Sequence, residues 1–190
     1  HDLAAQHLGV PLVEMLGRAH RELPTSITIG IKPVAETVAE GEEYVGRGFR
    51  VLKVKIGDAL DVDLERLRKL REGLGASVTI RVDANIGWTP ESAAALLPEL
   101  VRLGVELIEQ PFPPRRYAWL RDLQATSPLP IVADESAVAI EDLDALVGVV
   151  DGVNVKLAKC GGVGPAARML TRARELGFRT FLGCMEETSV

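Results

Sequence analysis

The stretch LKVKIG, residues 52–57, sets two lysines one residue apart within an otherwise apolar run. Side chains at alternate positions of a strand point to the same face, so Lys53 and Lys55 share one side of a sheet and the apolar residues share the other. Because lysines are almost never fully buried unless they are paired, a solvated edge strand is the simplest interpretation. The rest of the sequence indicates whether these two lysines face solvent or a polar site.

The run around these lysines, FRVLKVKI at 49–56, is one of seven short apolar segments rich in β-branched residues. Most of these segments are almost continuous in apolar residues, which is typical of parallel strands buried on both faces. The sequence therefore predicts a parallel sheet. The other six segments lie at 26–31, 77–83, 105–111, 129–136, 151–158 and 178–185.

Segments with the helical spacing of apolar residues lie between the predicted strands. Residues 59–75 alternate leucine or valine with charged residues at steps of three and four, and they end on Gly73 and Gly75. Residues 89–104 begin with Thr89 as a helix cap, followed by a proline at the first helical position. Strand and helix alternate along the chain, which is the βα unit of parallel α/β proteins.

Two architectures satisfy this alternation, an open doubly wound sheet and a TIM-type (β/α) barrel. We favour the barrel because polar residues follow the ends of many consecutive strands, whereas an open sheet concentrates its site at one switch point. We expect residues 1–25 to be a linker helix and residues 26–190 a partial barrel, with an eighth βα unit and an N-terminal capping domain lying outside this chain. Such a piece is expected to be inactive or prone to aggregation alone, because an incomplete barrel leaves strand edges unpaired.

Composition limits the class of partner. The 190 residues are 47% hydrophobic and carry a net charge of −5, which fits a globular protein with a filled core and offers no basic surface for nucleic acid. We expect a small-molecule partner, and homo-oligomerisation stays open. No run is long and apolar enough for a signal peptide or membrane span, and Cys160 and Cys184 form no disulfide framework. These features predict a cytoplasmic protein with free thiols.

Acidic residues end three neighbouring predicted strands: Asp83 the third, Glu109 the fourth and Asp134 the fifth. Any one of them is equally well explained as a cap of the next helix. Three carboxylates that converge in a polar mouth, however, repel one another unless a cation lies between them. Oxygen ligands favour a hard ion, and the lack of clustered histidines or thiols disfavours zinc. The sequence therefore predicts a Mg²⁺ site.

The lysines then gain a chemical role. Lys55 ends the second predicted strand and Lys156 ends the sixth, on opposite sides of the three acids. A substrate carboxylate near the metal would have its α-carbon between these lysines, and removal of the α-proton gives an enediolate that nearby cations stabilise. We expect Lys53, on the same face of the strand, to be such a cation and to help Lys55 act as a base. Bases on both faces predict inversion of the α-carbon.

Five motifs in this order resemble the enolase superfamily, and specifically its muconate lactonizing branch. They are KVK on the second predicted strand, RVDAN on the third, IEQP on the fourth, ADES on the fifth and NVKLAKCGG on the sixth. The resemblance implies a barrel fold and a Mg²⁺ cofactor. It also implies that Lys55 and Lys156 are the acid/base pair and that Asp83, Glu109 and Asp134 are the metal ligands.

Within this branch, KCGG and GCMEETS (residues 183–189) are most similar to dipeptide epimerases of the L-Ala-D/L-Glu type. The resemblance implies a dipeptide substrate that contacts Lys53, Thr28 and Cys184. Lys159, in the loop after the sixth strand, is expected to have a structural or solvated role. Other activities of the branch stay open, namely o-succinylbenzoate synthesis, N-succinylamino acid racemisation and muconate-type cycloisomerisation, and so does a non-catalytic ligand-binding barrel.

Overall fold

Seven parallel strands form one sheet in the computed structural model, which describes residues 1–185. Their spatial order follows the chain, so each strand pairs with its sequence neighbours. Every predicted apolar run contains one of these strands, which confirms the parallel sheet. The strands are β1 (Ile27–Ile29), β2 (Val51–Lys55), β3 (Thr79–Asp83), β4 (Val105–Glu109), β5 (Ile131–Ala133), β6 (Gly152–Lys156) and β7 (Arg179–Gly183).

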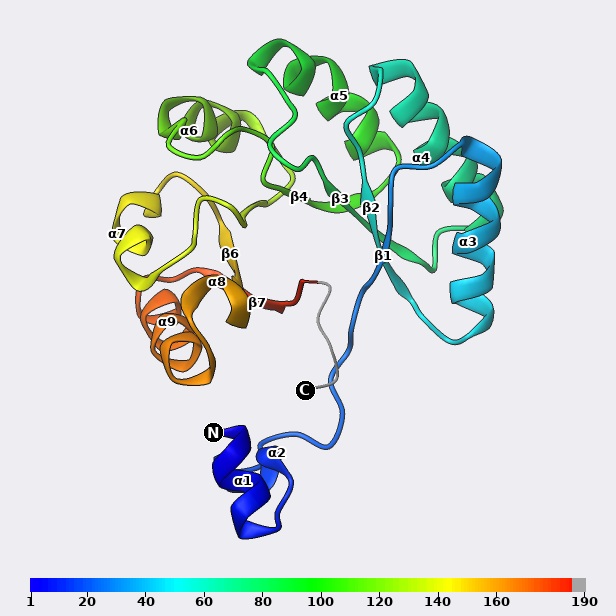
Figure 1. Cartoon of the computed structure of the whole chain (residues 1–190). Helices are drawn as coiled ribbons and strands as arrows, with labels where there is room; N and C mark the ends of the chain where they lie inside the picture. The colour runs from blue at the N-terminus through cyan, green and yellow to red at the C-terminus, as the bar shows by residue number, and fades with distance from the viewer. Residues whose placement is uncertain (186–190) are drawn as a thin grey trace.

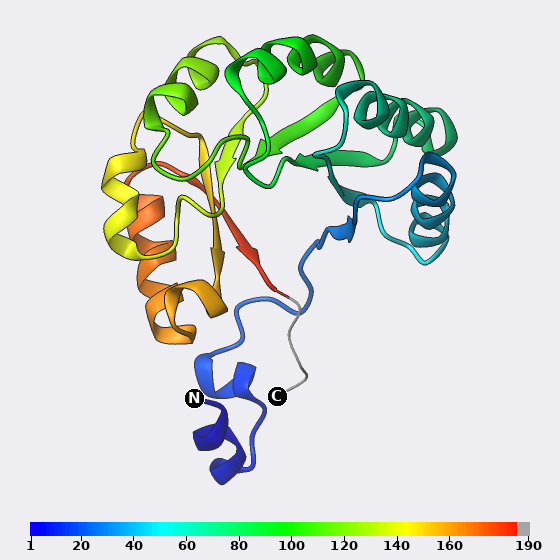
Figure 2. The ribbon, with the colours of Figure 1, turned by 45° about the horizontal axis from the view of Figure 1, so that its top comes forward.

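Helices connect the strands and cover the outer side of the sheet, which curls so that its other face is concave (Figure 1, Figure 2). Parallel strands need such crossovers, and the alternation of strand and helix confirms the predicted α/β class. The connecting helices are α3 (Val34–Gly46), α4 (Leu60–Leu74), α5 (Pro90–Arg102), α6 (Tyr117–Thr126), the 3₁₀ turn η1 (Ile140–Asp142), α7 (Leu143–Leu146), α8 (Leu157–Cys160) and α9 (Val163–Glu175).

Strand β2 separates apolar from charged side chains. Leu52 and Val54 are fully buried, whereas Lys53 and Lys55 are only partly buried. Since side chains alternate along a strand, the two lysines occupy the face opposite to the apolar residues. This face is the concave one, and β2 pairs with β1 on one side and with β3 on the other, so the lysines do not belong to an edge strand.

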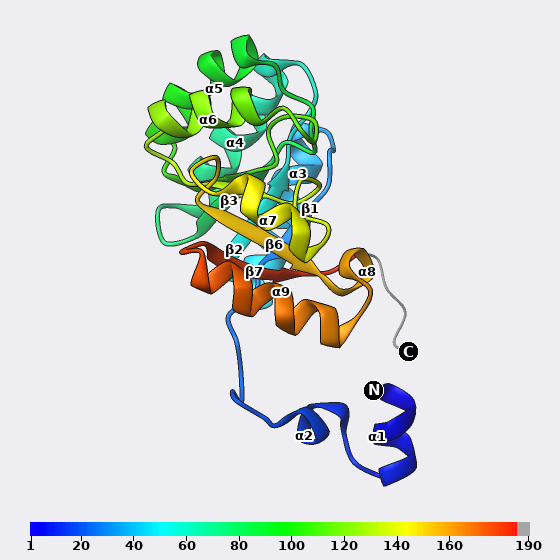
Figure 3. The same ribbon diagram turned by 90° about the vertical axis from the view of Figure 1, so that its left-hand side faces the viewer.

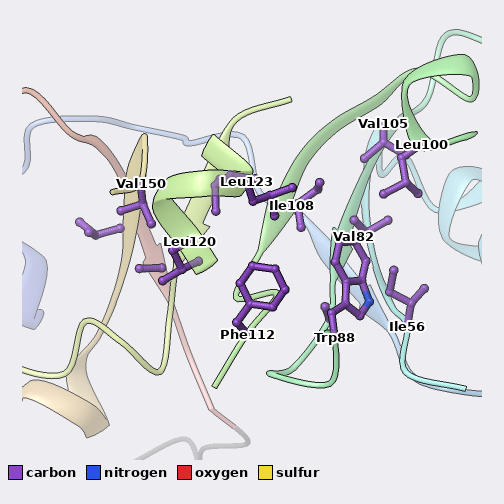
Figure 4. Packing of buried hydrophobic residues seen from close by; sticks show 14 of the residues in the cluster. Ile56, Val82, Trp88, Leu100, Val105, Ile108, Phe112, Leu120, Leu123 and Val150 are labelled. Carbon is purple, nitrogen blue, oxygen red and sulfur yellow. The ribbon is translucent and has the colours of Figure 1, made fainter. Parts of the chain in front are cut away.

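The apolar core fills the space between the sheet and the helices. Figure 4 shows Val82 of β3 and Ile108 of β4 in the same cluster as Leu120 of α6 and the ring of Phe112, and each of these residues is at most 1% exposed. Burying one such side chain stabilises a fold by about 1.5–3 kcal/mol. Because the outer face supplies this burial, the concave face is left for polar side chains.

The ends of two helices illustrate how closely sequence signals are followed. Thr89 caps α5, as the sequence indicates, and the structure adds a reciprocal hydrogen bond with Ser92. Helix α4 ends at Leu74, and Gly75 follows it with a left-handed φ of 72°. Gly73, which the sequence also places at the helix end, lies inside the helix. The helix continues past Gly73 because Leu74 belongs to the apolar stripe that packs against the core.

The segment before the sheet contains two short helices, α1 (Asp2–Leu8) and α2 (Leu12–Leu16), where the sequence predicts one. Gly9 ends α1 with a φ of 65°, and Pro11 lacks the N–H group that would continue the helix. Figure 3 shows both helices set apart from the sheet and joined to it by an extended segment. Within the described part of the chain, no helix has both the length and the apolar character required to span a membrane.

Candidate active site

The carboxyl ends of neighbouring strands bring charged residues side by side. Lys55 of β2 is the ladder partner of Asp83 of β3, which in turn pairs with Glu109 of β4. Asp134 directly follows β5, and Lys156 is the last residue of β6. The predicted catalytic and metal-binding residues thus lie at adjacent strand ends.

Lys53 lies between two buried carboxylates. Its Nζ is 3.0 Å from Asp83 Oδ2 and 3.0 Å from Glu109 Oε1, and the two acids are 1% and 4% exposed. Burial alone would lower the pKa of the Lys53 ammonium, but the Glu109 and Asp83 carboxylates outweigh it and raise this pKa above its ordinary value. Burial also raises the pKa of Glu109, which Lys53 offsets only in part. Lys53 therefore stays protonated and compensates the charge of both acids.

A second group of charges surrounds Asp134. Lys156 Nζ donates to Asp134 Oδ2 at 2.6 Å, and Lys159 Nζ donates to Asp134 Oδ1 and to its backbone oxygen, both at 2.5 Å. Burial would raise the pKa of Asp134, but the hydrogen bonds from these two lysines lower it below its ordinary value. Because α8 turns directly after β6, Lys159 points back to the strand ends. These contacts favour the structural role over the solvated one, because the Lys159 side chain is only 9% exposed.

Asn85 holds the other predicted base. Lys55 Nζ donates to Asn85 Oδ1 at 2.6 Å, and Asn85 Nδ2 lies 3.4 Å from Glu135 Oε1. The backbone of Asn85 has a φ of 42°, in the left-handed region that asparagine tolerates better than most residues. Its N–H also donates to Asp83 Oδ1 at 3.0 Å. Asn85 therefore orients Lys55 and Asp83 together.

Two further amides belong to the site although the sequence analysis gave them no role. Gln110 is fully buried, and its Oε1 accepts hydrogen bonds from the backbone N–H groups of Asp134 and Ser136 at 2.8 and 3.0 Å. Asn154 of β6 donates from Nδ2 to Glu109 Oε1 at 2.9 Å. The sequence contained a signal for both residues. Gln110 directly follows a predicted metal ligand, and Asn154 is a lone amide inside an apolar strand, where a buried polar group requires a partner.

A pocket of about 750 Å³ opens over the concave face, and the three residues predicted to contact substrate line it. These residues are Lys53, Thr28 of β1 and Cys184, which follows β7 and is a free thiol. Glu109 and Lys156 line the same pocket. The GCMEETS motif continues into residues 186–189, which lie outside the described residues. The predicted substrate residues and part of the predicted catalytic set therefore share one cavity.

The carboxylates provide oxygen donors suited to a hard cation. In the described chain, however, no three His, Cys, Asp or Glu side chains are grouped closely enough to hold a metal ion. Lys53 joins Asp83 to Glu109, whereas Asp134 is held separately by its two lysines. The donor set fits Mg²⁺ in its chemistry, because all three acids are buried and each already needs a positive charge beside it.

The fold and the site together define an α/β domain with lysines and carboxylates gathered at the ends of its parallel strands. Residues 36–190 match the family model described as Enolase C-terminal domain-like, and the chain belongs to this family. This match confirms the resemblance that the five motifs carry.

Dipeptide epimerases are among the most similar proteins. The L-Lys-D/L-Arg epimerase of Methylococcus capsulatus is 48% identical over 193 residues, which cover 100% of this chain and 54% of that protein. A crystal structure of the dipeptide epimerase from Methylococcus capsulatus with Mg and the dipeptide L-Arg-D-Lys has a TM-score of 0.85 at 48% identity, covering 99% of this chain and 54% of that one.

A substrate-liganded structure of the L-Ala-D/L-Glu epimerase from Bacillus subtilis has a TM-score of 0.91 at 34% identity, and it covers 98% of this chain and 54% of that one. The chain thus spans about half the length of the relatives that it matches.

Proposed function

We propose that this chain is the barrel part of a Mg²⁺-dependent epimerase, an isomerase that inverts the α-carbon of a dipeptide. The observation that carries the proposal is the position of Lys55 and Lys156, which end β2 and β6 on either side of the strands that present the three acids. The names of the relatives support the same reaction. Their TM-scores of 0.85 and 0.91 support a TIM-type (β/α) barrel.

Asp83, Glu109 and Asp134 are the residues that would hold Mg²⁺. When bound, the ion supplies positive charge that stabilises the negative charge developing on a substrate carboxylate. Lys53 adds a second cation at the same place, because its Nζ lies 3.0 Å from both Asp83 and Glu109. Together with its position in the pocket, this charge suits Lys53 to bind the substrate carboxylate.

Lys55 and Lys156 transfer the proton. One lysine, in its neutral form, takes the α-proton from one face of the substrate and becomes an ammonium, while the other gives a proton to the opposite face and becomes neutral. The substrate passes through an enediolate, and its total proton count is unchanged. Asn85 orients Lys55 and Asp134 orients Lys156, so that each nitrogen is fixed before the reaction.

Dipeptides with cationic side chains are the first substrates to test. The Methylococcus capsulatus relative, at 48% identity, is named for lysine and arginine, whereas the Bacillus subtilis relative, at 34%, is named for alanine and glutamate. The L-Ala-D/L-Glu type expected from the motifs therefore comes second. N-succinylamino acids and the o-succinylbenzoate precursor complete the panel, since related enzymes of this branch act on them.

Hydrogen exchange in deuterium oxide tests the proposal on the full-length protein with Mg²⁺. We expect deuterium at the α-carbon next to the free carboxylate of the dipeptide, in both epimers. Lys156→Ala and Lys55→Ala should each reduce exchange from one epimer by about 10²–10⁴-fold. Lys69→Ala is the matched control, because Lys69 pairs with Glu72 on the exposed side of α4.

Two results would contradict the proposal in different ways. Exchange at the wild-type rate in both lysine variants would exclude the two-lysine mechanism. Turnover of an N-succinylamino acid without any exchange into dipeptides would replace the dipeptide by another substrate and leave the mechanism standing.

A further inference from the structure

Asn154 connects the two charged groups of the site. Its Nδ2 donates to Glu109 Oε1 at 2.9 Å, and its backbone oxygen accepts from Lys159 Nζ at 2.9 Å. Lys159 in turn holds Asp134. One residue of β6 is therefore bonded directly to one carboxylate and, through a single lysine, to another.

The orientation of the Asn154 amide is set by Glu109. An ionised carboxylate only accepts hydrogen bonds, so the NH₂ group has to face it. Both Asn154 and Lys53 donate to Oε1 of Glu109, and these two bonds leave Oε2 as the oxygen available to a cation. The amide thus fixes which oxygen of Glu109 is engaged.

This orientation has a cost on the other side of the amide. Asn154 is only 5% exposed, and its Oδ1 has no hydrogen-bond partner among the described residues. A buried acceptor without a donor is unfavourable, because it loses water and gains nothing in return. Stability alone does not explain an amide whose Oδ1 is buried without a donor. A role in positioning Glu109 does explain it, because that role needs only the NH₂ group.

Gly183 of β7 provides the space for the amide. A Cβ atom at this position would lie 2.5 Å from Asn154 Oδ1 and 2.9 Å from Nδ2, which is closer than non-bonded atoms approach. The backbone does not require glycine here, because Gly183 does not have a positive φ. Free space beside Asn154 is therefore the reason for glycine at 183.

We propose that Asn154 is a positioning residue that prepares Glu109 to bind the metal, and that Gly183 permits this by leaving room for its amide. The inference rests on the proposed function, since it assumes that Glu109 is a metal ligand. It assigns a role to two residues that line the same pocket as Glu109 and Lys156 and would act through Glu109. Partners of this kind change metal affinity about 10–100-fold when they are removed.

A double-mutant cycle on the full-length protein tests the pair, with Mg²⁺ affinity measured by titration calorimetry. We expect Asn154→Ala to weaken Mg²⁺ binding about 10–100-fold. Gly183→Ala should also weaken it, because the new methyl group displaces the amide. In the double variant the clash is gone, so the affinity should equal that of Asn154→Ala alone.

Matched controls separate positioning from general damage. Gly46→Ala adds the same methyl group where nothing lies within 4 Å, and Gln124→Ala removes an amide that donates to the distant Asp151 at 3.3 Å. Neither should change Mg²⁺ affinity. Asn154→Leu keeps the branched shape of the side chain without the donor, so it should repeat the loss if Asn154→Ala fails to fold.

The outcomes are distinguishable. Mg²⁺ affinity within twofold of wild type in both folded Asn154 variants would overturn the role of Asn154. Additive losses in the double variant would overturn the role of Gly183, since its methyl group would then act without the amide. Wild-type protein that binds Mg²⁺ but exchanges no α-proton would overturn the proposed reaction, while weakened binding in the variants would still support the inference.

Discussion

Lys53 Nζ and Glu109 Oε1 lie 3.0 Å apart although their residues are 56 positions apart in the sequence. The same ammonium is 3.0 Å from Asp83, so one lysine of β2 pairs with the acids that end the next two strands. Its side chain is only 14% exposed, and the two carboxylate side chains are 2% and 6% exposed. A charge cluster with so little water depends on internal compensation.

Removing the Lys53 ammonium should show how far the buried carboxylates depend on its charge. In Lys53→Met, two buried carboxylates lose their shared cation, and we expect the metal-free protein to lose about 3–5 kcal/mol of stability. Mg²⁺ should restore more stability to this variant than it adds to wild type, because the ion then supplies the missing charge. Urea unfolding with and without Mg²⁺ measures both effects.

The control for Lys53 is a lysine whose partner is exposed. Lys69→Met breaks a pair with Glu72, whose side chain is 64% exposed, and it should leave stability close to that of wild type because water screens this pair. Equal stability of Lys53→Met and Lys69→Met without metal would show that the buried acids do not need Lys53.

Lys159 offers a separate test on the other charge group. Lys159→Met removes two donors from Asp134 and one from the backbone of Asn154, while Lys156 keeps its own bond to Asp134. We expect Mg²⁺ affinity to fall about 10–100-fold, as for other partners of metal ligands. Calorimetric titration checks this, and unchanged affinity would mean that Lys156 alone is sufficient to orient Asp134.

The fold could be predicted from the sequence because most of the parallel strands lie in nearly continuous apolar runs. A strand buried on both faces shows this pattern at any position in the sheet. Within β2, the alternation of apolar residues and lysines already indicated that they lie on opposite faces. The N-terminal helices were less predictable. Whether Gly9 and Pro11 break one helix or merely follow it depends on local geometry that apolar spacing does not encode.

The site was predictable only in part, because some of its residues depend on three-dimensional contacts and not on their position in a strand. Residues such as Asp83 and Lys156 end their strands, so position alone assigns them to the mouth. The side chain of Asn85 contacts Lys55 of β2, and that of Asn154 on β6 contacts Glu109 of β4. Contacts between different strands leave no periodic pattern in the sequence.

The backbone at Asn85 allows its side chain to be tested separately from its conformation. Asn85→Gly keeps the left-handed φ accessible but removes the acceptor for Lys55, so we expect exchange from the Lys55 side to slow by 10-fold or more, roughly the size of a lost positioning contact. Asn85→Val should also lower the melting temperature, because a β-branched residue is strained at a φ of 42°. If Asn85→Gly exchanged the α-proton of both epimers at the wild-type rates, a positioning role of Asn85 would be excluded.

A buried ion pair on α4 ties together the loops that follow β1 and β2. The Arg66 side chain is fully buried, pairs with Asp63, and donates to the backbone oxygen of Lys32, while Asp63 accepts from the backbone N–H of Gly57 at 2.9 Å. Asp63→Asn leaves the guanidinium without its buried counter-charge and should cost about 3–5 kcal/mol. Asp58→Asn is the control: it removes the other, 52% exposed carboxylate from the same arginine and should cost less than about 1 kcal/mol. Chemical denaturation of both variants decides the matter, since similar losses would place the charge compensation at Asp58 as much as at Asp63.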